Sequence, residues 1–425
     1  MDNTHVNQSL VVFVLGTTGV GKSKLAIELA KEYNGEIISS DSMQLYKDAG
    51  DITTNKVTTE EMQGVPHHMM SYLPMDTLNY NVGDFTLKAI EVVGKLPIVV
   101  GGTHYYTCSL LWSNSIISYD NDTPKVNDSS NDIENLDKEK YSFEKLKEID
   151  SVMAEKIHKN DIRKIKRSLD IFYSTGKKQS DIINTQFESK KLRYRSCLLW
   201  LECKDQQLLE TRLNTRVDEM IERGLIEEVF NIFKHPSITQ VTTENFTKGV
   251  TQAIGIKELY NYYVLLNQYN QNEKEFKSKY NIISNNITGT TTSLISSNDT
   301  NSSATTPTID KEKLKDEKKL KKEKEQLNKE LFNAISEIKS HTKRYAIRQV
   351  KWISKLSPEN QLEILKLDSS DLAKWNDNVF QVSKNYLESF LTNSNLNAFN
   401  INSNNNNDNN NNNKINNNDS DVLFY

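Results

Sequence analysis

The chain has 425 residues, little cysteine and no long apolar run. Its three cysteines, Cys108, Cys197 and Cys203, are too few for a disulfide framework or a four-cysteine zinc site, and they suit a reducing compartment. No stretch reaches the roughly 18 apolar residues of a transmembrane span, so we expect no membrane association. Residues 1–9 contain no Arg and no apolar core, so we expect no secretory or transit peptide and a cytoplasmic location.

The chain also lacks a strong overall charge. Its formal net charge is −4, so no whole-chain field attracts nucleic acid or a membrane. One segment differs: residues 156–195 contain 12 Lys and Arg against 4 Asp and Glu. A basic segment in an acidic protein is a candidate surface for a polyanion, although a solvated helical face would have the same composition.

The most informative motif that is present lies near the N-terminus. Its eight residues fit the phosphate-binding loop G-x-x-x-x-G-K-[ST]: Gly16, Thr17, Thr18, Gly19, Val20, Gly21, Lys22 and Ser23. An apolar run at residues 10–15 predicts a strand before the loop, and a helical pattern follows it. Backbone N–H groups and Lys22 would bind phosphate oxygens, and the Ser23 hydroxyl would bind Mg²⁺. Alone, the loop is typical of ATP- or GTP-binding enzymes.

The rest of the pattern predicts an α/β fold, a P-loop NTPase-like parallel sheet flanked by helices, with a helical insertion domain. Strands are expected at residues 36–40, 97–100 and 197–203, and helices lie between them in the pattern. Residues 136–188 read as helices, with Ile162, Ile165, Leu169 and Phe172 on one face of one of them. Residues 114–135 read as irregular, and the Asn-rich end of the chain cannot build a core.

Two polar groups follow predicted strands beside the loop. Asp41 ends the second strand, where a carboxylate could act as a general base, bind Mg²⁺ or cap the next helix. Gly101, Gly102 and Thr103 end the third strand, which indicates either a close approach to a ligand or a tight turn. The adjacent His67 and His68 have no third ligand nearby in sequence, so we interpret them as structural or substrate-adjacent.

With these residues in place, the chain resembles the tRNA dimethylallyltransferase (tRNA isopentenyltransferase) family, and more closely its eukaryotic branch. Eight blocks carry the resemblance in the family's order, at residues 16–23, 41–47, 64–68, 100–106, 160–177, 216–229, 252–258 and 342–352.

The resemblance implies a reaction. Members transfer a dimethylallyl group from dimethylallyl diphosphate to N6 of the adenosine 3′ of the anticodon (position 37) in tRNA. The loop would then hold the donor's diphosphate with Mg²⁺. Asp41 would accept or orient the N6 proton, Thr103 would position the reacting groups, and Arg216 would clamp the leaving diphosphate.

The resemblance also implies a tRNA anticodon stem-loop as partner of the basic insertion. The residues that match tRNA-contacting segments are Asp41, Ser42, Met43, Gln44, Arg163, Lys164, Arg167, Gln252 and Lys257. It further implies a mitochondrial pool beside the cytoplasmic one, as family members often have. We also expect a monomer. The expected domains are a catalytic core at 1–113, 196–267 and 331–392, a tRNA-binding insertion at 114–195, a low-complexity and charged insertion at 268–330, and an Asn-rich tail at 393–425.

The chain departs from the family at two places. No cysteine follows Cys203 in this sequence, so we expect it to lack the C-terminal zinc finger of many eukaryotic members. A stretch without acidic residues would take over its tRNA contact: Lys339, Lys343, Arg344, Arg348 and Lys351. Where the family usually has an Arg pair, this chain has Arg163 and Lys164.

Three other functions fit the loop. The first alternative is a prenyltransferase of free adenine nucleotides, but such an enzyme would not need the insertion. The second is a P-loop kinase of small molecules, but such an enzyme would carry an Arg-rich lid. A nucleic-acid-binding protein with a vestigial loop would not keep Lys22, Asp41 and Arg216 intact together.

Overall fold

The structure is a computed structural model that describes residues 9–92, 95–113, 137, 139–188, 191–236, 238, 246, 248–280, 307–356 and 362–392. The irregular segment expected at 114–135, the Asn-rich tail, and residues 281–306 of the low-complexity insertion lie outside these residues. The described chain divides into two compact units. The first contains residues 1–48, 56–213 and 344–425, and the second contains residues 49–55 and 214–343.

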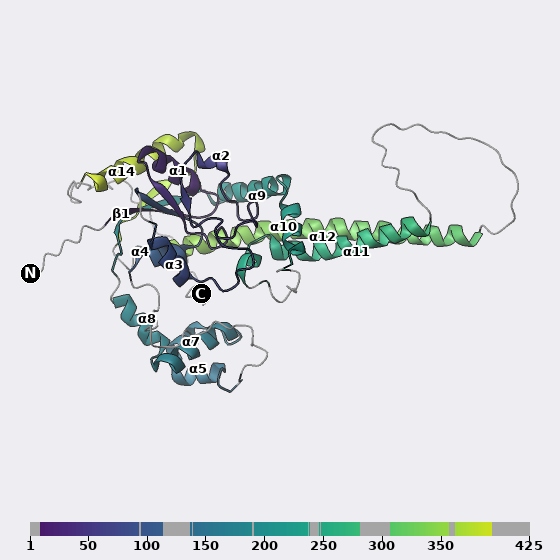
Figure 1. Ribbon diagram of the computed structural model, residues 1–425, viewed down its shortest axis with the longest axis horizontal. Coiled ribbons are helices and arrows are strands. Elements are labelled where there is room, and N and C mark those ends of the chain that lie inside the picture. Colours follow the sequence, from purple (N-terminus) through teal and green to yellow (C-terminus); the bar gives the residue numbers. More distant parts are fainter. Residues whose placement is uncertain are drawn as a thin grey trace, which may run out of the picture. The chain divides into compact units, whose positions relative to one another are not determined.

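The first unit is built on one parallel sheet, which confirms the predicted α/β class (Figure 1). Its six strands lie in the order β3-β2-β4-β1-β5-β6. They are β1 (Leu10–Gly16), β2 (Glu36–Ser39), β3 (His67–His68), β4 (Pro97–Val100), β5 (Arg195–Glu202) and β6 (Leu365–Asp368). Two strands were not expected from the sequence: β3 has only two residues, and β6 alternates Leu with Lys and Asp in place of an apolar run.

Helices cover both faces of this sheet, as parallel strands require. The helices of the first unit near the sheet are α1 (Lys22–Glu32), α2 (Thr59–Met62), α3 (Val82–Ile90), α4 (His104–Leu111) and α14 (Gln381–Leu391), with short turns η2 (Leu372–Lys374) and η3 (Asn376–Phe380) before α14. Leu25 and Leu29 of α1 and Leu387 of α14 are buried in one core with alternate residues of the strands. Phe85 of α3 packs on Tyr106 of α4, with 4.5 Å between the ring centroids.

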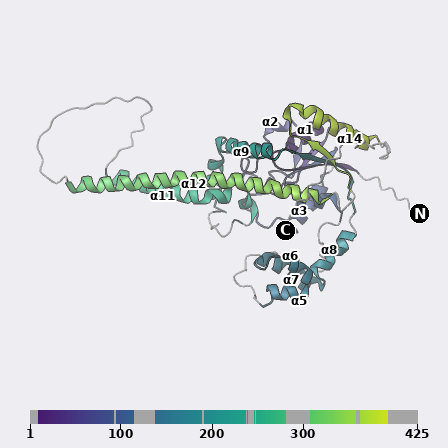
Figure 2. The ribbon, with the colours of Figure 1, turned by 180° about the vertical axis from the view of Figure 1, so that it is seen from behind.

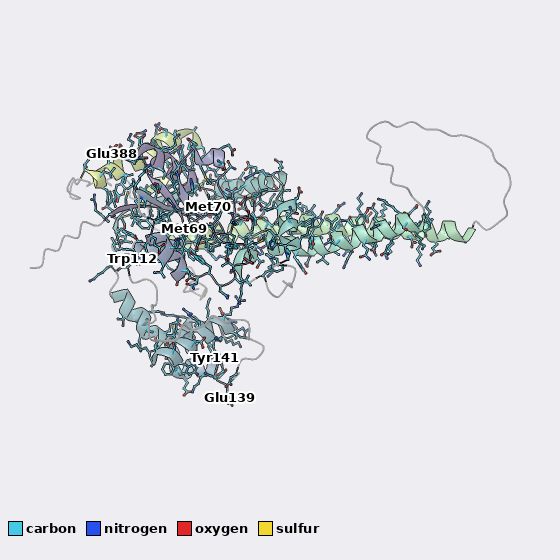
Figure 3. The ribbon with its side chains drawn as sticks, viewed as in Figure 1. Met69, Met70, Trp112, Glu139, Tyr141 and Glu388 are labelled. Carbon is cyan, nitrogen blue, oxygen red and sulfur yellow. The ribbon has the colours of Figure 1, made fainter. Side chains whose placement is uncertain are left out.

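The predicted helical insertion consists of α5 (Phe143–Ile149), α6 (Ser151–Lys156), α7 (Ile162–Thr175) and α8 (Gln179–Glu188). It has its own core, in which Leu146, Ile165 and Leu169 are buried. Ile162 was expected on this apolar face but is 44% exposed, because it starts α7 directly after the cap Asp161. A β-bridge between Trp112 and Leu192 joins the segment before the insertion to the segment after it. Trp112 and Tyr141 of the insertion are labelled in Figure 3.

The second unit is helical and contains a long antiparallel pair. Its elements are α9 (Gln206–Glu222), α10 (Leu225–Lys234), η1 (Gly249–Gln252), α11 (Ile256–Lys279) and α12 (Pro307–Ser354); α9 begins, and α12 ends, in the first unit. Figures 1 and 2 show α11 running beside α12, and Lys279 bonds Glu312 at 2.8 Å and Asp316 at 2.9 Å. The expected boundary at residue 330 falls inside α12, since the charged run and the segment after it form one continuous helix.

Candidate functional site

The strand order brings three strand ends together at one edge of the sheet. β4 lies between β2 and β1, and all three strands are parallel. The phosphate loop follows β1, Asp41 follows β2, and Gly102 and Thr103 follow β4. The carboxyl edge of a parallel sheet is where ligands bind, so the structure places these predicted site residues in one location.

The glycines of the phosphate loop are required by its backbone and by its neighbours. Gly16, Gly19 and Gly21 have φ of 146°, 83° and 92°, a region that side chains disfavour. A Cβ on Gly16 would stand 2.5 Å from the Leu201 carbonyl oxygen, and one on Gly21 would stand 2.7 Å from the Trp375 ring. Trp375 is itself held by a bond from its Nε1 to Glu28 at 2.8 Å. Trp375 was not expected at the loop, because it lies more than 350 positions further along the chain.

Lys22 and Ser23 begin α1 directly after the loop. Lys22 is buried, and its Nζ donates to the Thr17 carbonyl at 2.7 Å, so the ammonium lies within the loop. The Ser23 side chain is exposed. Thr17 is 3% exposed, and its Oγ1 has no hydrogen-bond partner among the described residues. Buried hydroxyls are normally bonded, so this atom is suited to a ligand oxygen.

This donor set fits Mg²⁺. Magnesium is usually held by one or two protein oxygens together with substrate phosphates. The exposed Ser23 hydroxyl provides such an oxygen beside the loop. Within the described part of the chain, no three His, Cys, Asp or Glu side chains cluster to hold an ion. A site that relied on one hydroxyl and the diphosphate would need no such cluster.

Asp41 and Thr103 are held next to each other by a small hydrogen-bond network. Asp41 Oδ1 accepts the Met43 N–H at 3.0 Å, so one oxygen makes the local capping bond. Thr103 Oγ1 accepts the Ser42 N–H at 3.0 Å and lies 3.0 Å from Ser42 Oγ. A Cβ on Gly102 would be 2.7 Å from Asp41 Oδ2, which shows how closely the two strand ends approach. Gln44 joins this network because its N–H donates to the Asp41 carbonyl at 3.1 Å, and its Oε1 accepts from Ser39 Oγ at 3.0 Å.

His104 lies beside this network and is fully neutral at ordinary pH. It is 4% exposed and stacks on Trp352 of α12 with 5.7 Å between centroids. Burial and then the nearby Lys22 ammonium lower the pKa of His104 to about 3. Its Nε2 has no hydrogen-bond partner among the described residues. A neutral imidazole can donate or accept at this atom, depending on its tautomer.

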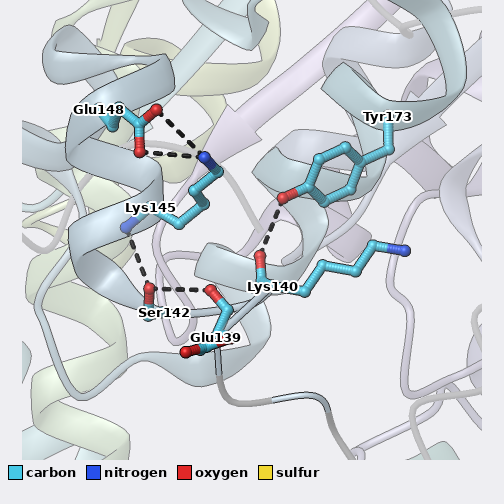
Figure 4. Close-up of polar contacts among 6 residues, drawn as sticks. All are labelled: Glu139, Lys140, Ser142, Lys145, Glu148 and Tyr173. Carbon is cyan, nitrogen blue, oxygen red and sulfur yellow. Dashed lines mark hydrogen bonds and ion pairs between the residues drawn. The ribbon is translucent and has the colours of Figure 1, made fainter.

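The tRNA residues predicted in the insertion lie on α7. Asp161 caps this helix by accepting the Lys164 N–H at 3.2 Å, and its other oxygen is 3.1 Å from Lys164 Nζ. Arg163 and Arg167 are exposed. Elsewhere in the insertion, Lys145 bonds both carboxylate oxygens of Glu148 at about 3 Å (Figure 4). Charges that a carboxylate compensates contribute less to a field that attracts RNA.

The remaining predicted residues belong to the second unit. Arg216 is half-buried on α9, and Gln252 and Lys257 are exposed at η1 and at the start of α11. Gln252 and Lys257 lie on either side of Gly255, whose φ is 110°. Glu228 of α10 holds residues 49–55 in this unit, since its carboxylate accepts bonds from Ile52 and Thr53 at 2.6 to 2.8 Å.

The adjacent histidines have structural partners. His67 Nδ1 lies 2.8 Å from the Val65 carbonyl, and His68 Nε2 lies 2.7 Å from Glu36 Oε2. Burial lowers the pKa of His67. Both residues form β3, where they pair with β2.

Comparison with known proteins gives similar sequences and a similar structure. A family model described as IPP transferase matches residues 44–287. A tRNA dimethylallyltransferase of Saccharomyces cerevisiae is 34% identical over 389 residues, which cover 90% of this chain and 76% of that protein. One from Schizosaccharomyces pombe is 41% identical over 259 residues, covering 58% of this chain and 59% of that protein. A solved structure of a eukaryotic dimethylallyltransferase acting on tRNA has a TM-score of 0.66 at 32% identity, covering 91% of this chain and 80% of that one.

Proposed function

The chain belongs to the IPP transferase family, and on this premise we propose that it transfers a dimethylallyl group to N6 of the adenosine 3′ of the anticodon in tRNA. It is an enzyme, a prenyltransferase that acts on tRNA. The observation that carries the proposal is the meeting of the phosphate loop, Asp41 and Thr103 at one sheet edge. Dimethylallyl diphosphate is the proposed donor.

The loop would bind the diphosphate of this donor. Backbone N–H groups at a helix N-terminus favour an anion, and Lys22 adds a buried positive charge. Bound at Ser23, Mg²⁺ would neutralise negative charge on the diphosphate. The proposed role of Arg216, a clamp on the leaving group, rests on the family resemblance.

Asp41 would take the proton from the adenine amino group. The N6 nitrogen attacks the allylic carbon, the bond from that carbon to the diphosphate oxygen breaks, and the electron pair leaves with the diphosphate. The N6 proton passes to Asp41, whose Oδ1 accepts the Met43 N–H while Oδ2 faces Gly102. Thr103 keeps this carboxylate's neighbours in place through its two contacts with Ser42.

tRNA would be bound by the basic residues of α7 and by residues of both units that match tRNA-contacting segments of the family. Arg163, Lys164 and Arg167 would contact phosphates, and the adenine would leave its stack to reach Asp41. The other proposed contacts are Ser42, Met43, Gln44, Gln252 and Lys257. A monomer and a cytoplasmic location with a mitochondrial pool stay predictions. No helix in the described ranges combines the length and apolar composition needed to cross a bilayer.

One assay separates the proposed function from its alternatives. The protein is incubated with labelled dimethylallyl diphosphate and either unmodified tRNA or AMP, and ATP hydrolysis is followed in parallel. We expect label in tRNA. Label in AMP alone would indicate an enzyme of free nucleotides, and ATP turnover without transfer would indicate a kinase.

A further inference from the structure

The C-terminal end of α12 supplies two polar side chains to the reaction centre. Tyr345 and Gln349 lie four residues apart and therefore share one helix face. Both reach the carbonyl oxygen of Gly102: Tyr345 Oη donates to it at 2.8 Å, and Gln349 Nε2 donates at 2.8 Å. A carbonyl oxygen has two lone pairs, so these two donors saturate it and fix the peptide that leads into Thr103.

Gln349 also binds the phosphate loop. Its Oε1 accepts the Thr18 N–H at 2.9 Å, and the side chain is almost fully buried, at 3% exposure. One amide group thus joins two strand ends, the loop after β1 and the turn after β4. Each of its two roles needs a different atom of the amide, one acceptor and one donor.

The same side chain lies close to the proposed base. A Cβ on Gly102 would meet Asp41 Oδ2 at 2.7 Å, Tyr345 Oη at 2.8 Å and Gln349 Nε2 at 3.2 Å, so these atoms surround one point. Burial and then the Asp41 carboxylate raise the pKa of Tyr345, so that its hydroxyl stays protonated and keeps donating. The arrangement would set the position of Asp41 and Thr103 relative to the diphosphate.

We propose that Gln349 is a positioning residue of the transfer reaction, which ties the diphosphate-binding loop to the Gly102 and Thr103 turn through both ends of its amide. This proposal rests on the proposed function, since it concerns the geometry of the same site. A misplacement of about 1 Å in such a site costs about 100-fold in rate. Loss of the amide therefore lowers kcat for transfer and raises KM for the donor, while KM for tRNA stays unchanged.

The test uses two variants that differ in the atoms they keep. Gln349→Met retains the approximate volume and loses both bonds. Gln349→Glu is ionised at about pH 8, where it accepts from Thr18 but cannot donate to Gly102. When protonated at about pH 5.5, the same carboxyl group has one donor and one acceptor, as the amide does. Burial and the Asp41 charge both favour this protonated form.

Activity is measured with labelled dimethylallyl diphosphate and tRNA from about pH 5.5 to 8, and each variant is divided by the wild type at the same pH. This ratio removes effects of pH that the variant shares with the wild type. The charged and polar groups near the amide are Asp41 after β2, Lys22 on α1, His104 on α4, and Tyr345 and Arg348 on α12. Ile347→Ala, on the exposed side of the same helix, serves as the matched control. Melting temperature reports folding of each variant.

We expect kcat/KM of Gln349→Glu to be about tenfold or more below wild type at about pH 8 and to recover to within about threefold at about pH 5.5. Gln349→Met stays low at every pH, and Ile347→Ala stays at wild type. The inference is overturned if both variants equal wild type, or if the Glu variant shows no recovery as the pH falls. Absence of transfer by the wild type would instead overturn the proposed function, and the inference with it.

Discussion

At the scale of single residues, the site separates charges into distinct roles. Lys22 is buried in the phosphate loop and bonded to Thr17, where it favours an anion. Asp41 lies at a nearby strand end with one oxygen bonded to Met43, and burial and the Lys22 ammonium keep His104 neutral. The buried Lys22 can thus favour the anionic leaving group while Asp41 accepts a proton nearby. His104 adds no second positive charge, because it is neutral.

Substitution Asp41→Asn removes the proposed proton acceptor and keeps the side chain's size and its capping oxygen. We expect kcat to fall about 100-fold or more, the usual contribution of a general base, with Kd for tRNA unchanged. Steady-state transfer and filter binding of tRNA give the two numbers. Glu91→Gln, which removes a surface carboxylate paired with Lys88, is the control. Wild-type kcat in Asp41→Asn would remove Asp41 from the role of base.

His104 should make the first unit sensitive to acid. Its folded pKa, about 3, lies below the ordinary value near 6.5, so the unfolded chain binds the extra proton between these values. The contribution of His104 to the free energy of unfolding is therefore complete above about pH 6.5. It falls as the pH drops, by at most about 1.4 kcal/mol per pH unit. In His104→Asn, the decline of melting temperature between about pH 6.5 and 4 should be shallower. An identical decline would contradict the assignment.

At the scale of elements, the strand–loop–helix unit and the helices of the insertion could be predicted because their patterns are local. β1, β4 and α7 follow directly from apolar periodicity and from loop and capping residues. Contacts from distant elements could not be predicted this way. Trp375, Tyr345 and Gln349 contact the site residues from over 240 positions away in the chain. The i, i+4 spacing of Tyr345 and Gln349 indicates a shared helix face, but it does not indicate what that face contacts.

The contact between Gly21 and Trp375 gives a prediction at this scale. Gly21→Ala would bring a Cβ 2.7 Å from the ring at a φ of 92°, so it combines a backbone penalty with overpacking. We expect a loss of about 2 to 4 kcal/mol in the free energy of unfolding in urea. Gly64→Ala is the matched control, since its φ is 79° and nothing lies within 4 Å of the added Cβ. It should cost about 1 to 2 kcal/mol. Equal losses would show that Trp375 does not restrict this glycine.

At the scale of the whole molecule, two sets of basic residues are the proposed RNA-binding surfaces. One is on α7, and the other is the acid-free stretch on α12. In the second set, Lys339 lies 2.6 Å from Asp218 and is therefore partly compensated. The domain bounds expected from the sequence could not foresee that α12 is one helix through residue 330, because composition changes there while the helix continues.

The α7 surface is tested by salt dependence. The double variant Arg163→Ala and Arg167→Ala should bind tRNA more weakly, and the slope of log K against log salt should flatten by about 1.4 to 1.8, since each phosphate contact contributes about 0.7 to 0.9. Lys145→Ala is the control, because Glu148 already compensates that charge. An unchanged slope in the double variant would contradict phosphate contact by α7.

The same measurement applies to the α12 stretch. Alanine at Lys343, Arg344 and Lys351, which are exposed, should weaken tRNA binding and flatten the slope if this stretch replaces a zinc finger. Lys339→Ala should change the slope less, because of its pairing with Asp218. A slope equal to wild type in the triple variant would remove this stretch from the RNA-binding surface.

The central claim is that a prenyl group is transferred to one adenosine of the anticodon loop. The most direct measurement incubates the protein with dimethylallyl diphosphate, Mg²⁺ and an anticodon stem-loop, then locates the added group by nuclease digestion and mass spectrometry. We expect the dimethylallyl group on N6 of the adenosine 3′ of the anticodon, and none in a stem-loop with guanosine at that position. A product with the group on another nucleotide, or no product with the adenosine present, would contradict the account.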